Sequence, residues 1–299
     1  MHTQQLIRIF LHFLKLGCLS FGGPAAHLVF FHRHFVQQLR WLSDAEYAQL
    51  VALAQLLPGP TSSQVGIAIG YQLQGYRGAC AAWLGFTLPS MLLMACFAVL
   101  GQQYFNQLSA MALHSIQLIV FAVVIWAFWQ MLTSFCQSVW QYILMLLSSL
   151  FLYFSPWSFS QVIVILVAAL VGIYFASDST SKLQDSGLKA KVHAKQAYLW
   201  LIAFVLPFVV FILWHSSSSL FSQSLFSFYQ AASLVFGGGH IILPLLHQDF
   251  VASHILSAEQ FDLGYALAQL MPGPLFSFAS YLGAWWCIKK YAKKKQVEF

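Results

Sequence analysis

A run of hydroxyl side chains follows a proline–glycine–proline triplet in an otherwise apolar stretch of the chain. Residues 58–60 read PGP, and Thr61, Ser62 and Ser63 follow directly. Proline ends a helix but suits the first turn of a new one, so the triplet predicts that one helix stops and another starts here. The new helix would combine unpaired N–H groups with three hydroxyls. This combination can bind an anion without a fixed positive charge, and the alternative is a simple helix kink.

The triplet occurs a second time near the C-terminal end. The sequence ALAQLLPGP at 52–60 returns as ALAQLMPGP at 266–274. Gln55 and Gln269 stand at matched positions before the two breaks. Each amide could donate to an oxyanion or could join two helices by a hydrogen bond. The second copy keeps one nearby hydroxyl, Ser277.

Two further blocks repeat in the same order. FGG at 21–23 matches FGG at 236–238, and Leu-Ser at 42–43 matches Leu-Ser at 256–257. A short period repeated many times would indicate a solenoid, whereas two long copies are typical of transporters built from homologous halves. His27 and His240 lie near the two glycine runs. Each is either a ligand or proton carrier, or a packed, neutral histidine.

The elements that position these breaks are predicted to lie in a lipid bilayer. Apolar residues make up 60% of the 299 residues and charged residues 7%, against about 25% in an average soluble domain. No Asp, Glu, Lys or Arg occurs in 78–177 or in 196–248. Because a membrane helix needs about 20 apolar residues, we predict an all-α, polytopic transmembrane helical bundle. Unbroken apolar stretches are expected at 79–101, 109–134, 139–154, 158–177 and 198–214, and broken ones at 6–31, 46–74, 225–247 and 259–287.

The basic residues border the apolar runs. Lysines gather in the polar segment 178–197 and in the C-terminal tail, and the positive-inside rule places both in the cytoplasm, with no nucleic-acid partner. The segment 32–40 contains Arg33 and Arg40, whereas 247–254 contains neither Lys nor Arg. Equivalent loops that differ in positive charge are expected on opposite sides of the membrane, so the two repeats are predicted to be inverted.

The repeats divide the chain into three parts. We predict a first transmembrane repeat at 1–177, a polar cytoplasmic linker at 178–197, and a second repeat at 198–299 that ends in a basic tail. The second repeat is shortened, because the first continues much further past its break. The missing helices would come from another subunit of a homo- or hetero-oligomer, or the chain is truncated and serves as a partner subunit without transport activity of its own.

Enzymatic motifs are absent from the sequence. It contains no HExxH, no GxSxG and no phosphate-binding loop that ends in Lys-Ser or Lys-Thr. The five cysteines form no pair at metal-ligand spacing. We therefore predict no enzyme activity, no catalytic residues, no metal site and no cofactor.

These motifs, taken in order, resemble the chromate ion transporter family of bacterial membrane proteins. The resemblance rests on FGGPAAH at 21–27, WLS at 41–43 and AQLLPGPTSSQ at 54–64 in the first half. In the second half it rests on VFGGGH at 235–240 and AQLMPGPLFSF at 268–278, and FTLPS at 86–90 also resembles a family block.

The resemblance implies a multi-pass carrier of the bacterial inner membrane that moves chromate, with sulfate as the similar oxyanion. Sulfate or another oxyanion is the alternative substrate. The residues that it marks for substrate binding lie at the glycine turns and at the two breaks. They are Gly22, Gly23, Pro24, Gln55, Pro58, Gly59, Pro60, Thr61, Gly237, Gly238, His240, Gln269, Pro272, Gly273 and Pro274. The hydroxyl run adds Ser62 to the predicted substrate-binding residues.

The membrane potential favours export. Each elementary charge that crosses the membrane gains or loses about 2.3 kcal/mol per 100 mV of potential. The potential of an inside-negative cell therefore drives a dianion outward with roughly 4.6 kcal/mol per 100 mV. Uptake would need coupling to protons or another ion. The acidic residues flank loops and suggest no buried proton relay, so we predict that chromate is exported.

Overall fold

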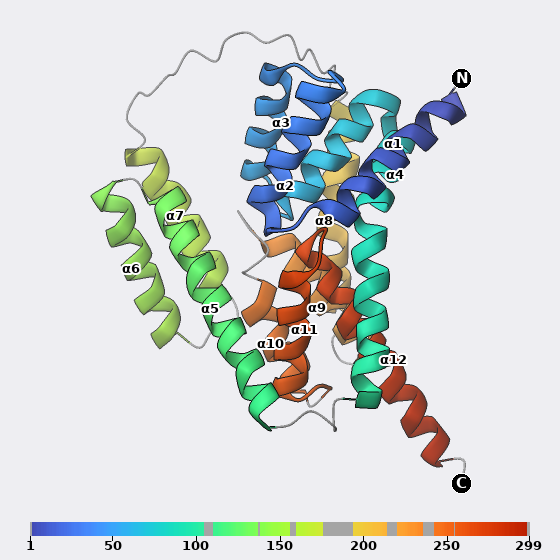
Figure 1. Cartoon of the computed structure of the whole chain (residues 1–299). Helices are drawn as coiled ribbons and strands as arrows, with labels where there is room; N and C mark the ends of the chain where they lie inside the picture. Colours follow the sequence, from blue (N-terminus) through green and yellow to red (C-terminus); the bar gives the residue numbers. More distant parts are fainter. Residues whose placement is uncertain are drawn as a thin grey trace. The chain divides into compact units, whose positions relative to one another are not determined.

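The computed structural model describes residues 2–104, 110–136, 138–155, 160–175, 194–213, 220–235, 242–253 and 255–297 (Figure 1). The regular structure in these ranges is helical throughout, which confirms the all-α prediction. Most of the predicted linker 178–197 lies outside the described residues. The candidate residues Gly237, Gly238 and His240 also lie outside them.

The chain forms two compact units. One consists of Met1–Phe121 together with Leu188–Phe299, and the other is Ala122–Gly187. The second unit contains α6 (Val139–Phe154) and α7 (Ser160–Phe175), which pack against each other. α5 (Ala110–Phe135) carries residues of both units, and every candidate site residue belongs to the first. The predicted boundaries near 177 and 198 were drawn from the repeats and stay a prediction.

The first half of the larger unit contains five helical elements. They are α1 (His2–Leu19), α2 (Gly23–Phe31), the π-helix η1 (His32–Gln38), α3 (Asp44–Leu56) and α4 (Thr61–Tyr104). Side chains from α1, α2, η1 and α4 meet in an aromatic core. Its fully buried members include Phe13, Phe31, Phe35, Val65 and Ile69.

The long helix α4 is folded back on itself. Its backbone leaves the helical conformation at Gln74 and Gly75, where φ is −145° and +57°. A Cβ atom on Gly78 would lie 2.1 Å from the carbonyl oxygen of Gly70. In a straight helix these residues would be about 12 Å apart. α4 therefore has a first arm at 61–73 and a second arm at 76–104, and only glycine allows the two backbones this contact.

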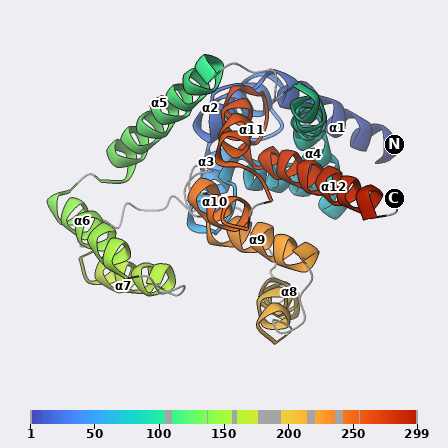
Figure 2. The same ribbon diagram turned by 90° about the horizontal axis from the view of Figure 1, so that it is seen from below.

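The second half of the larger unit packs on the second arm of α4. It contains α8 (Ala194–Leu213), α9 (Leu220–Leu234), α10 (Ile242–Val251), α11 (Ala258–Leu270), the 3-10 turn η5 (Leu275–Ser277) and α12 (Phe278–Val297). Met94 and Ala98 of α4 are fully buried in a core with Phe261, Phe278 and Tyr281. Figure 2 shows α12 beside α4, in agreement with their contacts. The second arm thus joins the two halves.

The length and apolar composition of one described helix agree with a membrane location. Among the described residues one helix, Thr61–Gly101, is long and apolar enough to cross a bilayer. Its unbroken part, 76–101, would extend about 39 Å, against a hydrocarbon core of about 30 Å. Shorter apolar helices are Val139–Phe154, Tyr198–Phe211 and Leu275–Ile288. The number of crossings stays a prediction.

Candidate functional site

The helix that leads into the first break, α3, has a capped N-terminus. The Ser43 hydroxyl accepts a hydrogen bond from the Glu46 N–H at 3.3 Å, and the Glu46 carboxylate accepts one from the Ser43 N–H at 2.8 Å. This capping box starts α3 at Asp44, as acids in a first turn predict. The hydrogen bonds that the Ser43 backbone and hydroxyl donate lower the pKa of Glu46. α3 ends where Leu57 becomes extended, because the residue before a proline disfavours the helical conformation.

The second break is built in the same way. Ser257 caps α11 by accepting from the Gln260 N–H at 3.3 Å, and the Gln260 amide oxygen accepts from the Ser257 N–H at 3.1 Å. Met271 after the helix has φ −81° and ψ 148°, close to the −87° and 145° of Leu57. The two copies therefore share the start, the length and the end of this helix.

Both breaks turn at a glycine with a positive φ. The angle is +125° at Gly59 and +94° at Gly273, a region that other residues rarely adopt. In the first copy the Gln64 amide closes the loop by donating to the Pro58 carbonyl at 2.7 Å. The central glycine of each predicted triplet thus has a conformational reason to be there.

Each break donates one backbone hydrogen bond to the other half of the molecule. The Gly59 N–H donates to the Val235 carbonyl at 2.6 Å, and the Gly273 N–H donates to the Ser20 carbonyl at 2.9 Å. Val235 and Ser20 each directly precede a Phe-Gly-Gly block. The two hydrogen bonds are therefore reciprocal: the break of each half is tied to the residue just before the Phe-Gly-Gly sequence of the other.

The first arm of α4 begins with buried hydroxyls. Thr61, Ser62 and Ser63 are 5%, 2% and 7% exposed, so the predicted run lies inside the unit at a helix N-terminus. The Ser62 hydroxyl lies 3.3 Å from Nδ1 of His27, which is fully buried on α2. The first-turn N–H groups of α4 and these hydroxyls form an environment that favours an anion.

The two glycines and two glutamines of the candidate set differ in their surroundings. Gly22 has φ +97° before α2, and no atom lies within 4 Å of the position that a Cβ on Gly23 would take. Gln55 is exposed on α3. Gln269 is half-buried and donates to the Tyr265 hydroxyl at 2.8 Å, one turn earlier on α11. The structure thus brings α2, the helix that follows the first glycine turn, to the hydroxyl run through His27 and Ser62, and it places neither glutamine amide beside them.

The second break is more enclosed and less polar. Pro272, Gly273 and Pro274 are all buried, and the chain continues as the 3-10 turn η5 before α12. Ser277, 3% exposed, is the hydroxyl of the turn itself, and the fully buried Ser90 of α4 lies beside Gly273. A 3-10 turn followed by an apolar helix start offers fewer aligned donors than the first turn of α4.

Sequence reasoning left two buried polar residues out of the candidate set. His27 belongs to the FGGPAAH block, so the block itself was a signal for it. Ser20 had none, because its position is marked only by the hydrogen bond that its carbonyl accepts from Gly273.

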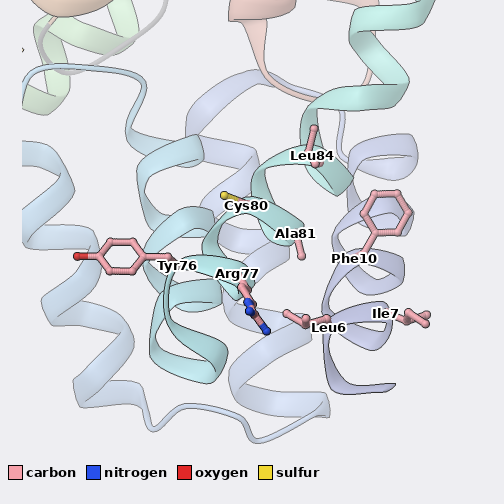
Figure 3. A pocket seen from close by; sticks show the side chains of 8 residues that line it. All are labelled: Leu6, Ile7, Phe10, Tyr76, Arg77, Cys80, Ala81 and Leu84. Carbon is pink, nitrogen blue, oxygen red and sulfur yellow. The ribbon is translucent and has the colours of Figure 1, made fainter. Parts of the chain in front are cut away.

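A groove of the unit lies away from the two breaks. It measures about 530 Å³ between α1 and the second arm of α4, and it is lined by apolar side chains such as Leu6, Phe10 and Leu84, with Arg77 at its side (Figure 3). It shares no residue with the candidate set. Within the described ranges, no group of three His, Cys, Asp or Glu side chains is placed to hold a metal ion.

The chain belongs to the chromate transporter family, and is therefore a membrane protein. The family model matches residues 7–173 and 222–289. The chromate transport protein of Pseudomonas aeruginosa is 27% identical over 92% of this chain and 65% of its own length. The chromate transport protein of Cupriavidus metallidurans is 28% identical over 94% and 68%. An uncharacterized transporter of Methanocaldococcus jannaschii is 27% identical over 94% and 70%.

The chain spans about two thirds of the length of these curated relatives. No solved structure matches it.

Proposed function

We propose that this protein carries chromate across the bacterial inner membrane and that it exports the ion, with sulfate as a second substrate of the same shape and charge. The observation that carries the proposal is the buried hydroxyl run Thr61, Ser62 and Ser63 at the start of α4. Relatives that match more than nine tenths of this chain are named chromate transport proteins, which supports the choice of oxyanion.

The chemistry of the break suits an ion that must bind and then leave. Hydroxyl and backbone N–H donors stabilise a tetrahedral dianion, and they do so without a buried lysine or arginine that would hold it too tightly. Irregular backbone at Pro58 and Gly59 is tolerated within a membrane only where protein or a water-lined cavity surrounds it. The break is therefore a suitable place for a substrate pathway.

Export follows from the charge of the ion. The potential drives a dianion outward with roughly 4.6 kcal/mol per 100 mV, twice the value for one charge. Of the described acids, Asp44 is exposed and Glu46 half-exposed at the start of α3, the end remote from the break, and Asp262 is half-buried on α11. The proposed direction therefore rests on the charge of the ion and the sign of the potential.

We also propose that the protein is a multi-pass bundle of two inverted repeats. The reciprocal hydrogen bonds from Gly59 and Gly273 support this, because contacts exchanged between equivalent segments are what a two-fold relation produces. In a chain whose five cysteines are replaced by serine, cysteine is introduced at the exposed, equivalent positions Gln37 and Ala252. Inverted repeats predict labelling by an impermeant maleimide from opposite sides of the membrane, and labelling from the same side would refute them.

Chromate accumulation in cells tests the transport function. Cells that express the chain should accumulate less chromate than cells with empty vector. The double substitution Pro58→Ala and Pro60→Ala should abolish the difference, because it removes the helix start that presents the donors. Pro207→Ala, at a proline within α8, is the matched control and should keep the wild-type effect. Equal accumulation with and without wild-type protein in the membrane would contradict chromate export by this chain.

A further inference from the structure

Two fully buried side chains beside the first break each carry a polar atom without a hydrogen-bond partner, and the half-buried Gln64 carries a third, its Oε1. Ser20 and His27 are both 0% exposed, and neither the Ser20 Oγ nor the His27 Nε2 has a hydrogen-bond partner. A buried polar group without a partner is costly, and native proteins contain few of them. Two within one small region indicate that something absent from the free chain completes them.

Contacts within the unit tie both residues to the break. His27 Nδ1 lies 3.3 Å from the Ser62 hydroxyl in the first turn of α4. The carbonyl of Ser20 lies beside the His27 ring, and that same carbonyl accepts the Gly273 N–H at 2.9 Å. The two unpartnered atoms therefore lie where the start of α4, the chain before α2 and the second break come together.

Two helix N-termini are directed to this region. α4 begins at Thr61, and α2 begins at Gly23 after a Gly22 that supplies no side-chain cap. Since His27 is in the second turn of α2 and its ring reaches the first turn of α4, the two helix starts are one side-chain contact apart. Both present unpaired N–H groups and the positive end of a helix dipole, which favours a negative ligand.

We propose that Ser20 Oγ and His27 Nε2 are ligands of the transported oxyanion and donate hydrogen bonds to a tetrahedral dianion held at the start of α4. The proposal rests on the proposed function and adds two residues and their role to that site. A neutral imidazole has one N–H. If the Ser62 hydroxyl donates to Nδ1, that hydrogen is on Nε2 and is available for donation to the ligand. The donors are then neutral, so the dianion is held without an ion pair.

Binding of chromate to the purified full-length chain in detergent tests this role, with sulfate as the non-oxidising competitor. Loss of one hydrogen bond to a charged ligand weakens binding by at least about tenfold. We expect that loss for His27→Ala and for Ser20→Ala. His27→Gln should stay within about threefold of wild type, because its amide places an N–H near the position of Nε2.

Two control variants separate ligand loss from damage to the fold. Ser227→Ala removes a buried serine of α9 whose hydroxyl donates to the Gln223 carbonyl, and His12→Ala removes a histidine of α1 that bonds His34. Both should bind chromate like wild type. Size-exclusion profiles and unfolding temperatures identify any variant that is not folded, and His27→Gln keeps the test open if His27→Ala is unfolded.

The outcomes distinguish this inference from the transport function. Unchanged affinity in folded His27→Ala and Ser20→Ala would overturn the ligand role, even if the wild-type chain transports chromate. Weakened binding in both variants, with His27→Gln near wild type, supports it. If wild type binds the ion in this pattern but moves none across a membrane, the ligand role holds and the transport proposal fails.

Discussion

The two breaks have the same construction and different chemistry. Each follows a serine-capped helix, each turns at a glycine with a positive φ, and each donates one backbone hydrogen bond to the opposite half. The first continues as an α-helix whose opening residues are three buried hydroxyl side chains. The second continues as a 3-10 turn of Leu275, Phe276 and Ser277.

This difference separates the structural role of the motif from its binding role. The glycine turn and its hydrogen bond hold the two halves together in both copies. Donors for an anion are concentrated in the first copy, beside Ser20 and His27. We therefore expect substitutions at the second break to act mainly on stability and substitutions at the first to act mainly on ion binding.

The largest effect should come from Gly273→Ala. A Cβ there would lie 2.9 Å from the Ser90 Oγ and 3.2 Å from the Gly17 carbonyl oxygen, at a φ of +94°. Backbone strain and overpacking together should lower the free energy of unfolding by about 3 kcal/mol. Gly59→Ala should cost less, about 1–2 kcal/mol, because its Cβ meets the movable end of Gln64.

Denaturant unfolding in detergent measures both variants. Gly172→Ala is the matched control, because no atom lies within 4 Å of its Cβ position on α7, and alanine there should be neutral or slightly stabilising. A cost at Gly59 equal to or above that at Gly273 would contradict the structural role assigned to the second break.

The next effect concerns the hydroxyl run. The triple substitution Thr61→Val, Ser62→Ala and Ser63→Ala should weaken chromate binding about 100-fold, since more than one charge-assisted hydrogen bond is lost. Ser277→Ala, the equivalent region of the second copy, should change it by less than about twofold. Equilibrium binding on folded protein decides between them, and equal losses at the two breaks would show that the ion site is symmetric.

The smallest effect distinguishes the two capping boxes. Ser43→Ala and Ser257→Ala should each lower the free energy of unfolding by about 1 kcal/mol at pH 7. In the first box the third helical residue is itself titratable, and the pKa of Glu46 is lowered from 4.5 by the hydrogen bonds that Ser43 donates. At α11 that residue is Gln260, and the acid whose pKa is lowered, by its own backbone N–H and in part by the Ser257 hydroxyl, is the neighbouring Glu259.

A carboxyl group with a lowered pKa stabilises the folded state above its unfolded pKa and loses that contribution as the pH falls through the folded value. The advantage of wild type over Glu46→Gln should therefore be complete above pH 4.5 and fade below it. Gln260→Glu should strengthen the acid dependence at α11, where Glu259 already has a lowered pKa. Unfolding curves recorded from pH 7 to below pH 4 measure both, and an advantage that persists at the lowest pH would contradict the role of the Glu46 carboxylate.

Local features were predictable because they depend on neighbouring residues. Proline and glycine at 58–60 determine where α3 ends and α4 begins, and Ser43 with Glu46 determines where α3 starts. The long uncharged runs predicted apolar helices. The gap between the expected apolar stretches 46–74 and 79–101 agrees with the turn at Gln74 and Gly75. Whether the chain folds back there was left open, because the contact between Gly70 and Gly78 is tertiary.

The roles of the glutamines were not predictable to the same degree. Their matched positions suggested a shared task, but Gln55 is exposed on α3 and Gln269 bonds Tyr265. A position in a repeat does not say which way a helix face turns, since the packing of the whole unit sets that. Their part in substrate binding stays a prediction.

Residue order alone was enough to establish an apolar helical protein with a motif present twice, because charge depletion and proline–glycine breaks act over short distances. It could not join Ser20 to Gly273, Gly59 to Val235 or His27 to Ser62, since nothing in the intervening residues encodes those approaches. They exist because α4 folds back and packs both halves against its arms. The candidate anion site is a product of that packing.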